Sequence, residues 1–198
     1  MSKILVTGFE PFATSSLNPS GEIVKALMGD DLVTAILPVV FGQASSTLKE
    51  LIDLHKPIAV LCLGQAEGRS EMTPERIAIN LDDARIADNA GNQPLEQRVI
   101  ADGPDGHFST LPIEKMVASM KAAGIPASIS LSAGTFVCNH IFYVLQDYLK
   151  DSPIKSGFMH VPLMDEQRKE FPNLPTMPIR QMVAGVQISL DVLRVETT

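Results

Sequence analysis

Cysteine is scarce in this sequence, because only Cys62 and Cys138 occur among 198 residues. Small secreted domains that depend on disulfides carry many more cysteines, so this chain does not belong to that class. The opening "MSKILVTGF" is typical of a first β-strand and lacks the charged and apolar regions of a signal peptide. We therefore expect two free thiols in a reducing, cytoplasmic compartment.

Basic residues and long hydrophobic runs are also in short supply. Lysine and arginine number 16 against 23 acidic residues, which gives a net charge of −7. A surface with this balance is unsuited to following a phosphate backbone, so nucleic acid is excluded as a partner. No apolar run approaches the ~20 residues that span a bilayer, so we expect no membrane-spanning segment.

Motifs that hold cofactors are missing as well. The sequence contains no Cys-x-x-Cys pair, no His-x-x-x-His pair and no carboxylate cluster at ligand spacing, so a metal site is not expected. It also contains no G-x-G-x-x-G or Walker loop, so a nucleotide cofactor is not expected. The chemistry therefore has to come from the side chains of the protein itself.

The sequence is 45% hydrophobic, and its apolar stretches alternate between strand-like and helix-like patterns. No internal repeat or linker divides it, so we expect one domain over residues 1–198. This alternation predicts an α/β fold with a largely parallel sheet, whose sites gather at the carboxyl ends of the strands. We expect strands at 3–9, 31–40, 58–64, the start of 74–94, 126–136 and 155–163, and helices at 20–29, 45–56, 113–124, 138–150 and 178–195.

Cys138 occupies a chemically suggestive position in "GTFVCNH" (134–140). It follows a predicted strand and lies in the first turn of a predicted helix, where free N–H groups and the helix dipole favour a thiolate. The same N–H groups could receive an oxyanion. The competing interpretation is a small buried hydrophobe, which is the better description of Cys62 inside the apolar run "IAVLCLG".

A nucleophilic cysteine needs a base, and the chain offers four histidines. His140 is a poor partner, because residues i and i+2 of a helix point to different sides. His55, near a helix end, is expected to be structural, while His107 on a glycine-rich loop stays open. His160, at the far end of a predicted strand, could reach the same sheet edge as Cys138, although a structural role fits it equally well.

A triad also needs an acid to orient the imidazole. The stretch "PERIAINLDDARIADN" offers four carboxylates, and spacing does not choose among them. The cost of burying an unpaired carboxylate mildly favours Glu75, which precedes the apolar "IAIN". The other three are expected to be solvated loop charges: Asp82, Asp83 and Asp88.

Taken together, the motifs resemble the pyroglutamyl peptidase I family, also called pyrrolidone carboxyl peptidases. The resemblance runs from the first strand almost to the C-terminus, and its cysteine motif and long middle motif are highly specific. The stretches that carry it are "LVTGFEPF" (5–12), "NPS" (18–20), "GQAEGR" (64–69), "PERIAINLDDARIADNAGNQP" (74–94), "STLPI" (109–113), "AGTFVCNHIFY" (133–143) and "GFMHVP" (157–162).

The resemblance implies a cysteine exopeptidase that removes an N-terminal pyroglutamyl residue, with no cofactor. It implies a single-domain, three-layer α/β/α fold, often assembled as a homotetramer. By matching motifs, the nucleophile is Cys138, the base is His160 and the orienting acid is Glu75, while Arg85 lies near the site and could help to hold the oxyanion. Two departures stand out: Glu67 replaces a residue that is usually small, and the region after Pro162 matches weakly.

Pyroglutamate is a neutral lactam, so its pocket needs apolar walls and a few hydrogen bonds and has no use for a carboxylate that holds an ammonium group. The resemblance assigns this pocket to Phe9, Phe12, Asn18, Gln65, Phe136 and Val137. Without the resemblance, each phenylalanine would be read as core. The alternative function is a catalytically silent relative that binds lactams or small peptides, and the intact Cys, His and Glu motifs argue against it.

Overall fold

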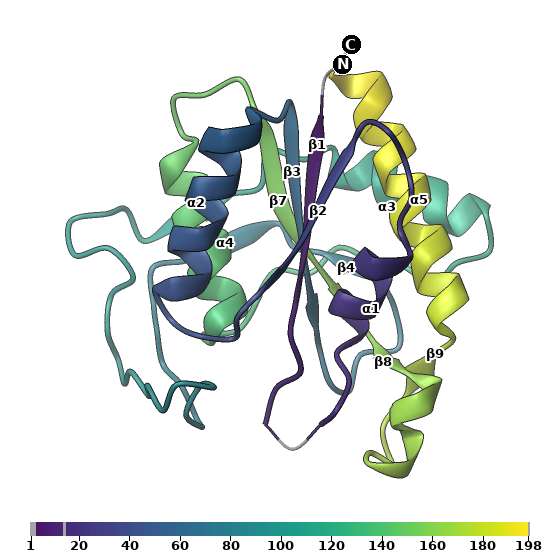
Figure 1. The fold of residues 1–198 in the computed structure, drawn as a ribbon, viewed down its shortest axis with the longest axis horizontal. Helices are drawn as coiled ribbons and strands as arrows, with labels where there is room; N and C mark the ends of the chain where they lie inside the picture. The colour runs from purple at the N-terminus through teal and green to yellow at the C-terminus, as the bar shows by residue number, and fades with distance from the viewer. Residues whose placement is uncertain (1–2, 14, 198) are drawn as a thin grey trace.

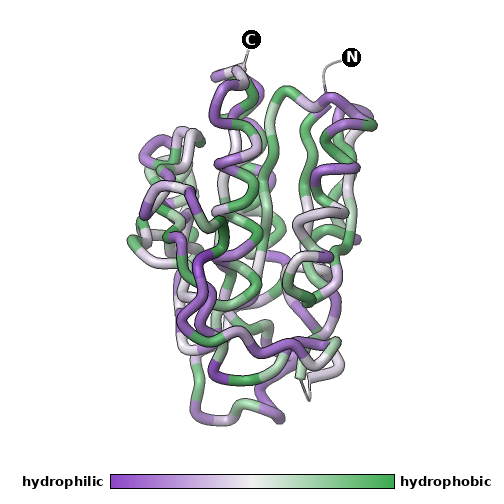
Figure 2. The backbone as a smooth tube through the Cα atoms, turned by 90° about the vertical axis from the view of Figure 1, so that its left-hand side faces the viewer, coloured by the Kyte–Doolittle hydropathy of each residue, from purple (hydrophilic) through white to green (hydrophobic). Residues whose placement is uncertain are grey.

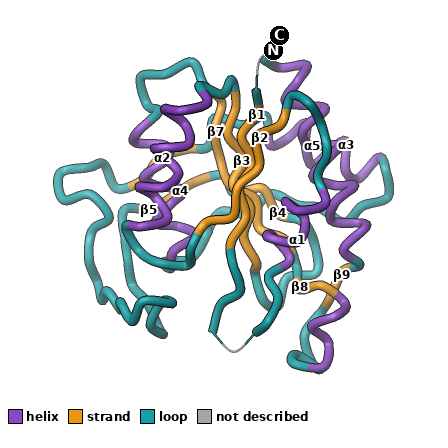
Figure 3. Tube along the Cα trace, in the orientation of Figure 1, coloured by secondary structure: helices purple, strands orange, loops and turns teal. Residues whose placement is uncertain are grey.

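A computed structural model describes residues 3–13 and 15–197 as a three-layer α/β/α structure (Figures 1 and 3). Its centre is a five-stranded sheet in which four neighbouring strands are parallel and the last strand is antiparallel. The predicted α/β class and largely parallel sheet are confirmed. In spatial order the strands are β2 (Leu32–Leu37), β1 (Ile4–Phe9), β3 (Ala59–Gln65), β7 (Lys155–Val161) and β4 (Thr73–Pro74).

Helices cover both faces of the sheet and begin and end close to the predicted positions (Figure 1). The helices on each face form a separate hydrophobic cluster with the strands. One face packs against α2 (Gln43–His55) and α4 (Val137–Tyr148), and the other packs against α1 (Pro19–Ala26), α3 (Ile113–Ala122) and α5 (Ile179–Glu196).

The central strands are apolar because both of their faces are covered. Every residue of β1 is buried, and its side chains alternate between the two clusters, Ile4 on one side and Leu5 on the other. The backbone trace in Figure 2 is accordingly hydrophobic along these strands and mixed along the helices. β2 lies at the sheet edge and ends at Leu37, because Pro38 has no N–H to continue the ladder.

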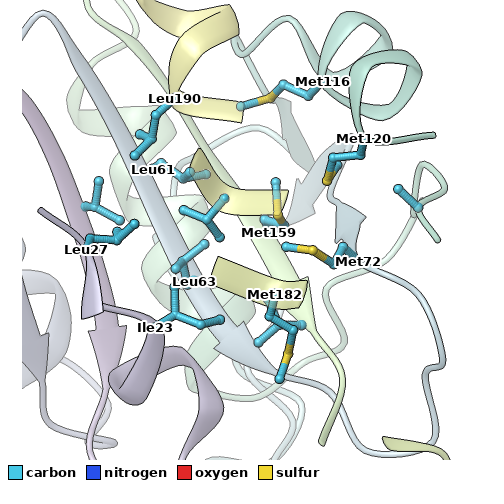
Figure 4. Packing of buried hydrophobic residues seen from close by; sticks show 14 of the residues in the cluster. Ile23, Leu27, Leu61, Leu63, Met72, Met116, Met120, Met159, Met182 and Leu190 are labelled. Atoms are coloured by element: carbon cyan, nitrogen blue, oxygen red, sulfur yellow. The ribbon is translucent and has the colours of Figure 1, made fainter. Parts of the chain in front are cut away.

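Methionines fill much of the core beneath α3 and α5 (Figure 4). Their unbranched side chains adapt to irregular gaps between helices that approach the sheet at different angles. The opposite face of the sheet carries Cys62 and Phe158 and packs against α4. The fully buried methionines are Met72, Met116, Met120, Met159 and Met182.

The predicted strand at 126–136 is wrong. The segment is extended but joins the structure only through isolated bridges, Met72 to Ala127 and Glu75 to Ser130. Pro74 interrupts a regular ladder because it lacks an N–H, although its carbonyl still accepts the N–H of Ser130 at 3.0 Å. Cys138 therefore follows an irregular segment that runs beside β4, and the two strands next to β7 are β3 and β4.

Short elements complete the fold outside the main sheet. They are β5 (Ile77–Ile79) paired with β6 (Gly106–Phe108), β8 (Leu163–Met164) paired with β9 (Thr176–Met177), and the 3-10 helix η1 (Asp165–Lys169). No helix within the described residues is long and apolar enough to cross a membrane. The carboxyl ends of β1, β3 and β7 meet at one edge of the sheet, which is where parallel folds carry their sites.

Close packing of β1 against α1 fixes this edge, and we predict that it does not tolerate a Cβ at Gly8. Such an atom would lie 2.3 Å from the carbonyl oxygen of Ser20, which is backbone and cannot rotate away. Gly8→Ala should therefore lower the free energy of unfolding by about 3 kcal/mol in urea denaturation. Gly124→Ala is the control: its site is open but has a φ of +76°, so it should cost only about 1 kcal/mol. Equal losses would contradict the prediction.

Candidate active site

A cavity of about 570 Å³ opens at the carboxyl ends of β1, β3 and β7. Segments that are far apart in the sequence surround it, among them the ends of β1, β3 and β7, the loop at 83–86, and the segment that leads into α4. Of the predicted site residues, Glu75 alone lies behind the wall. The others line the cavity: Phe9, Phe12, Asn18, Gln65, Arg85, Phe136, Val137, Cys138 and His160.

A buried pair, Glu75 and His160, stands at the base of this cavity. Oε1 of Glu75 lies 2.7 Å from Nδ1 of His160, and both side chains are almost fully buried. Register explains the contact, because Thr73 of β4 pairs with His160 of β7 and Glu75 follows directly after β4. A carboxylate can only accept, so the imidazole carries its proton on Nδ1 and leaves Nε2 free as a base.

Arg69 contacts the same oxygen of this carboxylate. Its Nη1 lies 2.7 Å from Oε1 of Glu75, and its Nη2 donates to the carbonyl of Ser132 at 2.9 Å. Burial opposes ionisation of Glu75, but the hydrogen bond from His160 and the positive charge of Arg69 outweigh it and hold the pKa of this carboxyl below its usual range. Glu75 is therefore the charged member of the pair.

The imidazole of His160 is the neutral member. Burial, more than any other factor, lowers the pKa of His160 below 6.5, and the positive charge of Arg69 acts in the same direction. The hydrogen bond and charge of Glu75 oppose this shift without overcoming it. At neutral pH the site therefore holds an unprotonated base in a fixed tautomer.

Cys138 is the second residue of α4, and its sulfur rests on the strand pair that carries His160. A Cβ at Gly64 would lie 2.9 Å from Sγ of Cys138 and 2.7 Å from Cζ of Phe158, so only glycine leaves room for the thiol here. Gly64 is also the register partner of His160. Sulfur and imidazole thus lie on the same face of β3 and β7, and both line the cavity.

The expectation of a thiolate at Cys138 is not met. Burial raises the pKa of the Cys138 thiol from 9.0 to about 12, and the negative charge of Glu75 adds to the effect. A helix dipole contributes only about 0.3–1 kcal/mol, which is less than one pKa unit, so burial prevails. The thiol of Cys138 is half-buried and protonated, whereas Cys62 is fully buried.

The first turn of α4 offers N–H groups beside this sulfur. Phe136 precedes the helix without a side-chain cap, and the first intrahelical bond runs from the N–H of His140 to the carbonyl of Phe136. The N–H groups of Val137 and Cys138 precede that bond and have no acceptor within the helix. They form a ready place for a developing negative charge.

Aromatic rings form one wall of the cavity. The ring of Phe12 lies 5.1 Å from that of Phe136, which in turn meets Phe41 edge-on at 5.3 Å. Phe9 is 3% exposed and belongs to the core as well as to the cavity wall. Both roles considered for it, core residue and pocket residue, therefore apply. This apolar wall suits a flat, uncharged ring.

The side-chain amides of Asn18 and Gln65 at the cavity differ in how many of their hydrogen-bonding groups already have partners. Asn18 caps α1, since its Oδ1 accepts from the N–H of Ser20 at 3.1 Å and its Nδ2 donates to the carbonyl of Glu10 at 2.9 Å. Gln65 accepts a hydrogen bond from Gln167 through its Oε1 at 2.9 Å. Asn18 is therefore largely committed to the fold, while the Nε2 of Gln65 makes only a long hydrogen bond, 3.4 Å, to Oε1 of Glu67.

The arginine that the sequence places near the site, Arg85, is not the one that contacts the buried carboxylate. Arg85 is exposed at the cavity mouth and makes no ion pair with any described residue. The arginine that contacts the buried carboxylate is Arg69, which the motifs do not indicate as a site residue. The only available signal was its position at the end of "GQAEGR", directly after the strand that lies beside β7.

Other histidines and acids serve the structure elsewhere, and the expectation of solvated loop charges is wrong for Asp82 and Asp88, because both are buried and hydrogen-bonded. Nδ1 of His140 lies 2.8 Å from Oδ2 of Asp82, and Nε2 of His107 lies 3.5 Å from Oδ1 of Asp147. Asp88 accepts from backbone N–H groups of its own loop. Among the described residues, no group of three or more histidine, cysteine or acidic side chains could hold a metal ion.

Comparisons with known proteins agree with this geometry. The sequence profile of the family described as pyroglutamyl peptidase matches residues 2–196. The pyrrolidone-carboxylate peptidases of Cupriavidus necator and Aliivibrio fischeri are each 48% identical to the chain, with 96% and 98% of this chain and 92% and 93% of theirs covered. The crystal structure of pyroglutamyl peptidase I from Bacillus amyloliquefaciens superposes with a TM-score of 0.93 at 40% identity, covering 97% of this chain and 95% of that one. The pyrrolidone carboxyl peptidase of Pyrococcus furiosus gives 0.92 at 37%, covering 99% and 100%. The chain belongs to the pyroglutamyl peptidase family.

Proposed function

We propose that this protein releases N-terminal pyroglutamyl residues from peptides by acyl transfer through Cys138, with His160 as base and acid and Glu75 as the orienting group. Family membership makes it a cysteine peptidase, a hydrolase of pyroglutamyl peptides. The observation that carries the residue roles is the hydrogen bond from His160 to Glu75 at the base of the cavity that Cys138 lines.

The first step converts a neutral pair into a nucleophile. Nε2 of His160 takes the proton of the Cys138 thiol as Sγ forms a bond to the pyroglutamyl carbonyl carbon. The carbonyl π electrons move to oxygen, and the N–H groups at the start of α4 hold the resulting oxyanion, with Arg85 as a further donor from the cavity mouth. Glu75 stabilises the imidazolium that forms.

The remaining steps break the peptide bond and then hydrolyse the thioester, and His160 transfers a proton in each. The oxyanion collapses, the C–N bond cleaves, and His160 gives its proton to the leaving amine. A water molecule then attacks the thioester while His160 accepts its proton. Cleavage of the C–S bond releases pyroglutamate and restores the Cys138 thiol.

Recognition of the lactam is supported by the chemistry of the walls. Phe12, Phe136 and Val137 offer apolar surface for the ring, and Phe9 supports them from the core. Gln65 offers a hydrogen-bond donor, and Asn18 contributes through the N–H that its capping role leaves over. A neutral ring without a free ammonium group needs no more than this.

The cellular location, the domain extent and the oligomeric state are proposed from general features of the chain. Two free cysteines support a cytoplasmic location, and the single sheet with both faces covered supports one catalytic domain over residues 1–198. Exposed apolar side chains such as Phe108 and Leu131, at 67% and 69% exposure, support a homo-oligomer, which the family resemblance suggests is a tetramer. The alternative, a silent relative that only binds lactams, would show no release from a pyroglutamyl-coumarin amide.

We predict that Cys138→Ala and His160→Ala each abolish turnover of that amide, and that the double variant is little worse, because members of a triad act as a unit. Glu75→Gln should lower kcat by roughly ten- to a thousandfold, since Glu75 orients the imidazole and transfers no proton. Circular dichroism should verify that each variant is folded.

Arg76→Met is the matched control for these variants. Arg76 follows Glu75 in the chain, but its partner is the exposed Glu114 at 2.7 Å. Its kcat should equal that of the wild type. Wild-type kcat in His160→Ala would contradict the triad.

We also predict that the free enzyme holds a neutral thiol and a neutral imidazole. Because the pKa of His160 is lowered from 6.5, kcat/KM should be lost only as the pH falls through a value below 6.5, and should be level above it. Alkylation of Cys138 by iodoacetamide should still be accelerating from about pH 7 to about pH 10, since thiolate is the reactive form. Peptide mapping should find the adduct on Cys138 and none on Cys62. An alkylation rate that is constant above pH 7 would indicate a preformed thiolate and contradict the neutral pair.

A further inference from the structure

We propose that Gln167, which lies outside the cavity lining, fixes the amide of Gln65 so that the cavity presents an N–H donor to the ring carbonyl of pyroglutamate. The inference rests on the proposed function and adds a residue to its specificity. Gln167 is a positioning residue, because it acts through Gln65 and does not line the cavity.

Gln167 is a fully buried polar side chain on η1. Its Oε1 accepts the backbone N–H of Met164 at 3.0 Å. Its Nε2 faces three oxygens: Oγ of Ser15 at 3.1 Å, the carbonyl of Leu17 at 3.3 Å and Oε1 of Gln65 at 2.9 Å. Both ends of this amide are therefore engaged, and buried amides of this kind are held in one orientation.

The orientation of the Gln167 and Gln65 amides follows from neighbouring groups that can only donate or only accept a hydrogen bond. A backbone N–H can only donate, so the atom of Gln167 beside Met164 has to be the oxygen. The carbonyl of Leu17 can only accept, so the atom of Gln167 that faces it has to be the nitrogen. That nitrogen also faces Gln65, and the nearest atom of Gln65 consequently has to be Oε1.

The remaining end of the Gln65 amide is then its NH2 group. Gln65 lines the cavity at the carboxyl end of β3, where Nε2 lies 3.4 Å from Oε1 of Glu67, a long contact that leaves the donor weakly engaged. A free Gln65 could turn either its oxygen or its nitrogen toward a ligand. With Gln167 in place it offers only N–H.

A donor at this position discriminates by chemistry. The lactam carbonyl of pyroglutamate accepts a hydrogen bond, whereas a cyclopentane ring of similar shape offers nothing and leaves Nε2 without a partner. Sites built to hydrogen-bond a ligand reject analogues that lack the partner far more strongly than apolar pockets reject a missing methylene. Gln167 therefore contributes to specificity for the ring carbonyl.

The test is to reverse the polarity of position 167. Gln167→Glu keeps the shape and the acceptor for Met164 but replaces the NH2 group with oxygen. Gln65 must then turn its own NH2 group toward residue 167 and its oxygen toward the cavity. The readout is the ratio of kcat/KM for the coumarin amides of pyroglutamate and of cyclopentanecarboxylic acid, at alkaline pH so that the new carboxyl is ionised. A ratio is unaffected by the fraction of folded enzyme.

We expect Gln167→Glu to lower this ratio by roughly 10- to 100-fold. Gln167→Met is the comparison variant: it removes the constraint without reversing it, so Gln65 can still turn its N–H to the ring and the ratio should fall less. A purely structural role predicts no difference in the ratio between the two. Gln65→Glu, at a half-buried position, removes the donor directly and should match Gln167→Glu even if the latter folds poorly.

Binding separates this inference from the proposed function. Pyroglutamyl amide and cyclopentanecarboxamide should be titrated calorimetrically into the Cys138→Ala protein with residue 167 as Gln or Glu. Absence of wild-type turnover alongside a preserved wild-type preference for the lactam would overturn the proposed catalysis and support the inference. A Kd ratio and a kcat/KM ratio that stay within about threefold of wild type in Gln167→Glu, whatever Gln65→Glu shows, would overturn the inference alone.

Discussion

The hydrogen bond between Glu75 and His160 is the interaction on which the site depends. It joins two side chains that are both buried, at 2.7 Å, and Arg69 contacts the same carboxylate oxygen. Removing His160 would leave the buried carboxylate of Glu75 with Arg69 as its remaining partner, and a buried polar group that loses a hydrogen bond costs about 1–3 kcal/mol. The bond also fixes the tautomer of the imidazole, so the free Nε2 is a consequence of the fold and needs no substrate to arise.

Burial sets the protonation of the reacting groups as well as their geometry. The same apolar surroundings that raise the pKa of the Cys138 thiol lower the pKa of His160. Charge separation is therefore deferred until the sulfur attacks, when the helix N–H groups and Glu75 can stabilise the two new charges together. Gly64 makes this possible, because only a residue without a side chain lets the sulfur lie over β3 beside the imidazole.

Much of this arrangement could be predicted from sequence, for identifiable reasons. The apolar runs of β1, β3 and β7 and the periodicity of the helices are local, and they gave the α/β class. The segment at 126–136 was misjudged because its apolar residues pack beside β4 without a regular ladder. Spacing could not select Glu75 or His160, since their contact depends on the register of β4 and β7; the family resemblance supplied them. Arg69 lies only six residues from Glu75, but no pattern in the sequence indicates that contact, and Gln167 contacts Gln65 across 102 residues of sequence.

The central claim is that the reaction passes through a pyroglutamyl thioester on Cys138. The most direct test is to mix the enzyme with an activated pyroglutamyl ester, quench in acid within the first turnover, and map the modified peptide by mass spectrometry. The mechanism predicts one pyroglutamyl group on the peptide that contains Cys138, and none in Cys138→Ala. Sustained release of pyroglutamate with no acyl group on Cys138, or with the group attached elsewhere, would contradict it.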